Sequence, residues 1–270
     1  MSDPLGDVRG AEVQVSTPDA FASNWVAQGD GSARMRLITQ GLVKDSYTAA
    51  VQIQLAPTAI TYWRQPGEAG VPPEFSFTGS ENLANATVLY PAPSRMDEAG
   101  LQAFGYRGGV TFPIKVHPID PQKPVHLKLT LAYAICDKIC LPAKGQAELV
   151  LPQSGAGPEQ GAIAAAEANV PLMLKTEDVA KDVTIRAASG GAKPQWLIQW
   201  QGATAAADLF AEGPQGWDFD VHKTGTNSFS LTAVDRPEHA PPNVAVRLTV
   251  TSPDKSYEFT APLDAGVAAR

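Results

Sequence analysis

Residues 129–142 read LTLAYAICDKICLP and contain the only two cysteines of the 270-residue chain, Cys136 and Cys140. Ahead of these cysteines, apolar side chains recur at every second position: Leu127, Leu129, Leu131, Tyr133 and Ile135. This period of two is typical of a half-buried β-strand. The sequence therefore predicts a strand that leads directly into the cysteine pair.

The spacing of the cysteines limits how they can pair. On a straight strand their Cα atoms would lie roughly 13 Å apart at ~3.3 Å per residue, whereas a disulfide needs Cα atoms about 4.4–6.8 Å apart. A bridged pair therefore requires a turn at Asp137-Lys138, and Asp is a favoured turn residue. Pro142 is expected to discourage ladder pairing beyond this turn. The motif is interpreted as a tight C-x-x-x-C corner at the end of a strand, with a reversible disulfide.

Three kinds of chemistry fit this corner. A structural disulfide that closes a ring of about five residues would stabilise the fold by only ~2 kcal/mol. A zinc site would need about four ligands, and His117 and His126, the nearest imidazoles, lack paired spacing. A redox-active dithiol would benefit from the short separation, because it could open and close without disturbing the core. The acidity of the thiols stays open, since Lys138 would lower a thiol pKa and Asp137 would raise it.

Composition narrows the class of protein. A chain of 270 residues with 44% hydrophobic and 18% charged residues predicts a globular protein of two ordinary domains. The net charge is −7 and no basic block occurs, which argues against a nucleic-acid partner. No apolar run approaches the ~18 residues of a membrane-spanning helix. The first residues lack an apolar signal core, so we expect either a cytosolic protein or a signal peptide that was removed.

Short β-prone runs fill the first half of the chain, with no amphipathic helix between them. They are residues 33–39, 47–55, 58–63, 75–77, 86–90, 110–116, the strand into Cys136, and 147–151. Gly41 is expected in the connection between the first two. Such spacing favours an antiparallel β-sandwich. The expected domains are a loose lead-in over 1–20, a first sandwich over 21–152, a linker with a short helix over 153–170, and a second sandwich over 171–270.

The linker and the second region have their own signals. Residues 152–160 are rich in Gly and Pro, and the Ala-rich run 161–169 predicts a short helix that Pro171 stops. Trp196, Ile198 and Trp200 share one face of a later strand and are interpreted as core. We expect a second, smaller sandwich with no chemistry of its own.

Residues 133–142 (YAICDKICLP) resemble the active-site segment of the periplasmic N-terminal domain of the DsbD/ScsB family of thiol:disulfide interchange proteins. Further blocks resemble the ScsB-like branch and fall in the same order across residues 30–152: TYWRQPGEAGVPP at 61–73, GSENL at 79–83, YPAP at 90–93 and FGYR at 104–107.

The resemblance implies an all-β fold of two immunoglobulin-like antiparallel sandwiches, a periplasmic location and no cofactor. It implies exchange through Cys136 and Cys140, with Cys140 forming the mixed disulfide. Electrons would arrive from a membrane-embedded redox partner domain and leave to a thioredoxin-fold periplasmic protein. Two alternatives stay open, a non-catalytic adaptor or chaperone-like sandwich with a structural disulfide and a copper-handling protein. No metal ligand is assigned.

The same family covers its cysteines with an aromatic residue on a loop that corresponds to Arg95–Phe104. Here Ala99 stands about where that aromatic residue would fall, so Phe104, Met96 or Leu101 is expected to substitute. The neighbouring pair Asp97-Glu98, like Glu177-Asp178, is expected to be solvated.

Aromatic residues are expected to contact the partner around the cysteine corner, because they supply much of the binding energy of small interfaces. They are Tyr62, Trp63, Phe104 and Tyr106.

Overall fold

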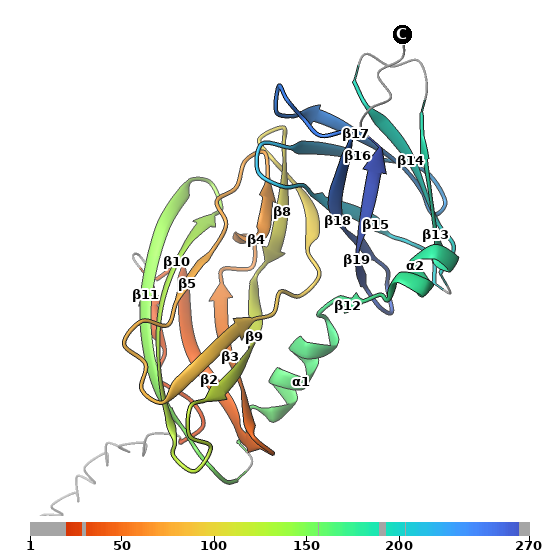
Figure 1. Cartoon of the computed structure of the whole chain (residues 1–270). Coiled ribbons are helices and arrows are strands. Elements are labelled where there is room, and N and C mark those ends of the chain that lie inside the picture. The colour runs from red at the N-terminus through yellow and green to blue at the C-terminus, as the bar shows by residue number, and fades with distance from the viewer. Residues whose placement is uncertain (1–19, 29–30, 156, 189–192, 203, 265–270) are drawn as a thin grey trace, which may run out of the picture.

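The computed structural model describes residues 20–28, 31–155, 157–188, 193–202 and 204–264. The chain folds into two β-sandwiches, as predicted, and the two lie side by side (Figure 1). Within the described residues, the strand pairs are antiparallel except for one short parallel pair between residues 172–173 and 257–258. Of the expected lead-in over 1–20, all but Ala20 lies outside the described residues. No helix in the described part of the chain is long and apolar enough to cross a membrane.

The first sandwich consists of two sheets. One sheet has the strand order β1-β2-β3-β9-β6, and its strands are β1 Val26–Gln28, β2 Ala33–Val43, β3 Ser46–Leu55, β9 Gly109–Pro118 and β6 Leu83–Val88. The other has the order β11-β10-β4-β8-β7, with β5 paired to β10; its strands are β11 Cys140–Leu151, β10 Val125–Cys136, β4 Ile60–Gly67, β8 Leu101–Arg107, β7 Ser94–Glu98 and β5 Glu74–Ser76.

The second sandwich is built from two four-stranded sheets. They follow the orders β12-β19-β18-β15 and β13-β14-β17-β16. The strands are β12 Leu172–Met173, β19 Tyr257–Asp264, β18 Asn243–Thr251, β15 Asp208–Glu212, β13 Val183–Ala187, β14 Gln195–Trp200, β17 Ser228–Asp235 and β16 Asp218–Gly225. Trp196, Ile198 and Trp200 point into its core, as predicted.

Alternation along β10 explains the core of the first sandwich. Every second residue from Leu127 to Ile135 is buried among residues of the facing sheet, because successive side chains of a strand point to opposite faces. Ala134 and Cys136 have the other parity and lie on the outer face of their sheet, in a small separate cluster. The pattern that builds the core therefore also turns Cys136 away from it.

Two local expectations were wrong. Pro142 does not end the ladder: β11 begins at Cys140, and Ala134 pairs with Pro142. Since β11 is an edge strand, a residue without an N–H group is tolerated there. Gly41 lies inside β2, at a register shift of that strand, with a φ of +85°. A positive φ serves a β-bulge as well as a turn, so glycine alone did not distinguish the two.

Two helices connect or cover the sandwiches. The predicted Ala-rich helix is α1 (Gln160–Ala168), and α2 (Thr176–Asp182), which contains the pair Glu177-Asp178, was not predicted. Helix α1 packs on the outer face of the first sheet, where Ile163 is fully buried with Ile38 and Ala50. We propose that the first domain extends through α1, to about residue 170, rather than ending at 152.

This boundary can be tested with two fragments. A fragment ending at Val170 should unfold cooperatively, whereas one ending at Leu151 should be less stable by about 2–4 kcal/mol, because it exposes the apolar surface that Ile163 covers. Both fragments lack the second sandwich, so the difference between them reports on residues 152–170, which include α1 and Glu159, the ion-pair partner of Arg36. Equal midpoints in urea denaturation would contradict the proposed boundary.

Candidate active site

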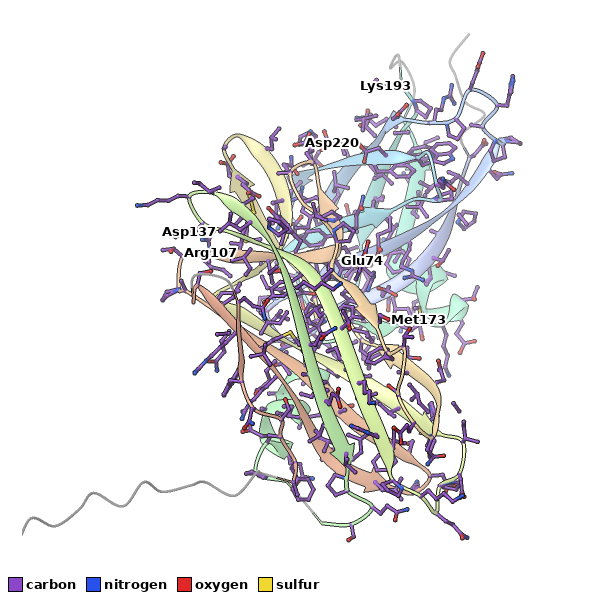
Figure 2. The ribbon with its side chains drawn as sticks, turned by 90° about the vertical axis from the view of Figure 1, so that its left-hand side faces the viewer. Glu74, Arg107, Asp137, Met173, Lys193 and Asp220 are labelled. Carbon is purple, nitrogen blue, oxygen red and sulfur yellow. A yellow bond between two sulfur atoms is a disulfide. The ribbon has the colours of Figure 1, made fainter. Side chains whose placement is uncertain are left out.

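The cysteines face each other at the tip of the β10–β11 hairpin. Cys136 is the last residue of β10 and Cys140 the first of β11; the two are register partners joined by a disulfide, with Cα atoms 4.0 Å apart. The chain reverses at Asp137, Lys138 and Ile139, as the sequence predicted, and Asp137 lies at the end of this ribbon (Figure 2). Because the bridge joins residues that already pair, it constrains the turn and little else.

The two sulfur atoms differ in access. Cys136 is 2% exposed and packs against Ile60 and Ala134, whereas Cys140 is exposed at the start of the edge strand. A reacting partner can therefore reach Cys140, while Cys136 is shielded. In a disulfide exchange this geometry separates an outer cysteine from an inner one.

Tyr62 lies directly against the inner cysteine. Its hydroxyl oxygen is 2.8 Å from Sγ of Cys136 and 3.7 Å from Sγ of Cys140. The ring packs against the backbone of Gly70. A Cβ at that position would lie 2.5 Å from Cδ1 of Tyr62, so a larger residue would displace the ring. Burial, followed by the hydrogen bond to Glu98 and its charge, raises the pKa of Tyr62 well above the ordinary value. The phenol is therefore neutral at physiological pH and acts as a hydrogen-bond donor.

Glu98 completes the site. Oε1 of its side chain lies 2.7 Å from Sγ of Cys140, and Oε2 accepts a hydrogen bond of 2.6 Å from the hydroxyl of Tyr62. A disulfide sulfur carries no proton, so the contact with Cys140 becomes a hydrogen bond once the pair is reduced and the thiol donates to the carboxylate. One carboxyl group thus links both cysteines.

The expectation that Glu98 is merely solvated was wrong. The segment expected to be a loop is a hairpin of β7 and β8, closed by Ala99 and Gly100 with φ values of +55° and +86°. Two positive φ values characterise the tight hairpin turn that matches the twist of antiparallel strands. This turn holds Glu98, the residue before Ala99, over Cys140. The Ala-Gly pair between alternating residues is the signal that sequence reasoning missed.

The expected covering residues lie in different places. Met96 packs against the cluster that contains Cys136, and Leu101 is 48% exposed opposite Glu98 in the hairpin. The ring of Phe104 does not cover the sulfurs: it packs edge to face on Phe210 of the second sandwich, with ring centroids 5.0 Å apart.

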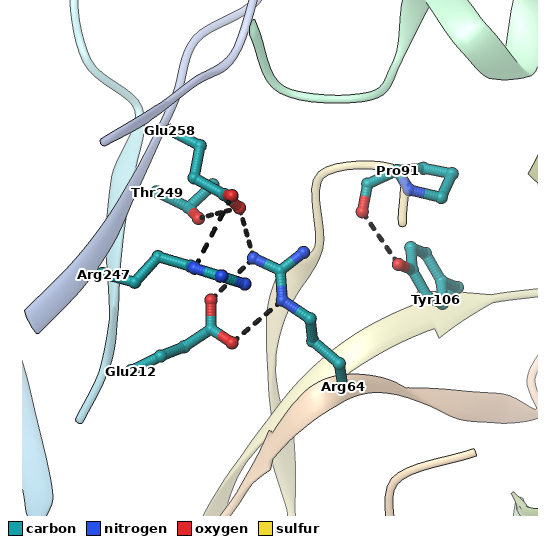
Figure 3. A network of polar contacts seen from close by, with 7 residues as sticks. All are labelled: Arg64, Pro91, Tyr106, Glu212, Arg247, Thr249 and Glu258. Atoms are coloured by element: carbon teal, nitrogen blue, oxygen red, sulfur yellow. Dashed lines mark hydrogen bonds and ion pairs between the residues drawn. The ribbon is translucent and has the colours of Figure 1, made fainter. Parts of the chain in front are cut away.

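Three of the four expected partner-contacting aromatics are buried: Tyr62 is 1% exposed beside the cysteines, and the other two are core residues. Trp63 is fully buried, and Tyr106 is 8% exposed with its hydroxyl donating to the carbonyl oxygen of Pro91 at 2.8 Å (Figure 3). Neither ring offers contact area to a partner. Strand alternation separates Trp63 from the sulfurs, because Tyr62, its neighbour on β4, points to the opposite face of the sheet.

A shallow groove runs beside the exposed cysteine. Its volume is about 330 Å³, and Cys140 contributes to its wall together with Val71, Tyr133 and Leu141. Val71 and Leu141 are 58% and 47% exposed, and Ile139 in the turn is 73% exposed. Apolar side chains therefore lie beside the sulfur that a partner can reach.

Within the described residues, Glu98, Cys136 and Cys140 are the one group of three whose ligand-type atoms lie within 4.8 Å of one another. A closed disulfide offers no thiolate, and three donors are one fewer than a structural zinc site uses. His126 lies elsewhere, 3.1 Å from Glu148. The geometry therefore favours sulfur chemistry over metal binding.

Comparisons with known proteins agree with this site. Residues 34–152 match the family model described as thiol:disulfide interchange protein DsbD, N-terminal. The whole fold is similar to the crystal structure of the N-terminal periplasmic domain of ScsB from Proteus mirabilis, with a TM-score of 0.70 and 21% sequence identity over 92% of this chain and 100% of that chain. No curated protein matches. With its close cysteine pair at the hairpin tip, the region over residues 34–152 is a DsbD/ScsB-like N-terminal thiol:disulfide interchange domain.

Proposed function

We propose that the chain is a periplasmic thiol:disulfide oxidoreductase that receives electrons from a membrane-embedded redox partner domain and passes them to a thioredoxin-fold protein. The observation that carries this proposal is the pairing of one exposed and one buried cysteine at a hairpin tip. An exchanger needs one sulfur that a partner can attack and a second sulfur within bonding distance that resolves the intermediate. A purely structural bridge requires neither access nor asymmetry.

The reaction starts from the reduced pair. The Cys140 thiolate attacks the disulfide of the thioredoxin-fold protein, which releases one of its cysteines as a thiolate and forms a mixed disulfide. Cys136 then loses its proton and attacks Sγ of Cys140, which releases the second cysteine of the substrate. Two electrons have moved to the substrate, and the Cys136–Cys140 disulfide of the present structure has formed. A dithiol of the membrane-embedded partner restores the reduced pair by the reverse steps.

The apolar groove beside Cys140 supports a transient complex. Val71, Ile139 and Leu141 are exposed near the reactive sulfur, and an apolar patch of this size suits the centre of a small, transient interface. The edge position of β11 leaves backbone groups free for strand pairing with a partner. Docking here would bring the partner's sulfur to Cys140 rather than to Cys136.

We further propose that Glu98 covers Cys140 in place of the aromatic residue found in the family. The carboxylate touches the sulfur and disfavours a second negative charge beside it, so it holds the proton on Cys140 when the pair is reduced. Small oxidants react with thiolates rather than thiols. The carboxylate would therefore protect the reduced pair by charge, until a docked partner displaces the hairpin.

The cysteine roles can be tested by trapping. The substrate is a thioredoxin-fold protein that retains only its attacking cysteine, activated as a mixed disulfide with thionitrobenzoate. Cys136→Ser should form a stable mixed disulfide through Cys140, and Cys140→Ser should react at least roughly tenfold more slowly because its remaining sulfur is buried. The release of thionitrobenzoate gives the rate, and mass spectrometry identifies the adduct. Equal rates, or no adduct with either variant, would contradict the proposed exchange.

The reversibility of the bridge distinguishes an exchanger from an adaptor with a structural disulfide. Thiol counting by mass should show two alkylated cysteines only after mild reduction. Titration against glutathione or dithiothreitol should give a reduction potential above about −300 mV, whereas a structural bridge would lie below that value. A potential below it would favour the adaptor.

The role of Glu98 predicts a pH effect. In reduced Glu98→Gln, Cys140 should react with iodoacetamide roughly tenfold faster at neutral pH, because removal of the carboxylate charge allows the thiolate to form at lower pH. Glu148→Gln, which makes the same chemical change on β11 beside His126, serves as the control and should leave the rate unchanged. An unaltered pH profile in Glu98→Gln would show that the carboxylate does not act on the thiol.

A further inference from the structure

Strand β15 of the second sandwich divides its residues between two domains. Leu209 and Ala211 are buried in the core of their own sandwich. Asp208, Phe210 and Glu212, which have the other parity, contact the first sandwich. A strand with one face in each domain fixes the domains to each other.

Phe210 forms the apolar part of this contact. It is 1% exposed and packs into the core of the first sandwich rather than its own. Its ring meets those of Trp63 and Phe104 edge to face, with centroids 5.8 Å and 5.0 Å away. Trp63 belongs to β4 and Phe104 to β8, so the single side chain of Phe210 contacts two strands of the first sandwich.

Two arginines of the first domain complete the contact. Arg64 donates two hydrogen bonds to Glu212, of 2.9 Å and 2.6 Å, and pairs with Glu258 of β19 as well (Figure 3). Arg95 donates two to Asp208, of 2.9 Å and 3.1 Å, and one of 3.0 Å to the carbonyl oxygen of Leu209. Bidentate pairs fix orientation as well as distance.

These arginines lie on the two elements that carry the cysteine-contacting side chains. Arg64 is two residues after Tyr62 on β4, and Arg95 is three residues before Glu98 on β7. Gln102 accepts a further hydrogen bond from Arg95, which ties β8 to the same group. The second domain therefore contacts both of the strands that carry Tyr62 and Glu98.

We propose that β15 is a positioning element for the redox site: through Arg64 and Arg95 it holds Tyr62 and Glu98 against Cys136 and Cys140. This inference rests on the proposed function and assigns to the second sandwich a role in setting the reactivity of the cysteines. Asp208 and Glu212 are positioning residues, because they act on the sulfurs only through Glu98 and Tyr62.

Several titratable groups lie near Cys140, and only some of them can change its reactivity when β15 is altered. They are Glu98 and Tyr62 in contact, Glu74 and Tyr133 along the groove, and Asp137 and Lys138 in the turn. Burial raises the pKa of Tyr133 to about 12, so that phenol, like Tyr62, is neutral. Of these groups, β15 is connected through Arg95 to Glu98. A substitution in β15 that releases Arg95 should therefore speed the alkylation of Cys140 at neutral pH, in the same direction as the removal of the Glu98 charge but by less.

The test measures alkylation of Cys140 in the reduced full-length protein as a function of pH, in the presence of EDTA. Asp208→Asn removes the charge that holds Arg95 and should speed the reaction roughly threefold at neutral pH, the effect of a half-unit shift of the profile. The matched control is Asp220→Asn, which makes the same chemical change elsewhere in the second sandwich, where Oδ2 of Asp220 lies 2.7 Å from Nε2 of His222. This control should leave the profile unchanged.

A double-variant cycle shows whether Asp208 acts through Glu98. In a Glu98→Gln background, Asp208→Asn should add nothing to the alkylation rate, since the group it positions is already uncharged. An additive effect, an unchanged profile in Asp208→Asn, or an equal shift in Asp220→Asn would each overturn the proposal. Thermal unfolding followed by circular dichroism shows whether Asp208→Asn folds. If it does not, Glu212→Gln replaces it, and the measured quantity becomes the rate at which Cys140 forms the trapped mixed disulfide. The same outcomes then support or overturn the proposal. Failure of the wild-type protein to exchange with any thioredoxin-fold protein would instead contradict the proposed function.

Discussion

The hairpin pairing that sets Cys136 opposite Cys140 is the constraint on which the site depends. Because the two residues are register partners in the β10–β11 ladder, their sulfurs are brought together by the backbone pairing of the two strands and not by the bridge alone. The ring closed by the disulfide is too small to hold much loop entropy, so its loss changes the stability of the domain little. A pair placed in this way can cycle between oxidised and reduced states on a fold that stays the same.

The period of two along a strand assigns structural and chemical roles to adjacent residues. On β10, Ile135 enters the core and Cys136 faces outward; on β4, Trp63 enters the core and Tyr62 contacts Cys136. The same two strands therefore build both the core and the site. The hydrogen bond of 2.9 Å from the Thr61 hydroxyl to the Ala134 carbonyl oxygen joins the two strands at this point.

The electrostatics of the site join the two domains. A carboxylate on the β7–β8 hairpin contacts the exposed cysteine, and an arginine on the same hairpin pairs with a carboxylate of the second domain. Both ion pairs between β15 and the first domain are largely withdrawn from solvent, with side chains 17–24% exposed, so screening by salt weakens them less than surface pairs. The second sandwich, which contains neither cysteine, is thereby connected to the environment of the cysteines.

The sequence by itself determined the elements that depend on local pattern. Alternating apolar residues predicted β10, the Cys-x-x-x-Cys spacing predicted the turn at Asp137-Lys138, and the Ala-rich run predicted α1. Only the tertiary structure decided which polar group meets the sulfurs. Glu98 and Cys140 lie 42 residues apart, and Arg64 and Glu212 lie 148 apart. Such contacts depend on strand order and on how two domains pack, and these follow from the burial of the whole chain rather than from any short segment of it.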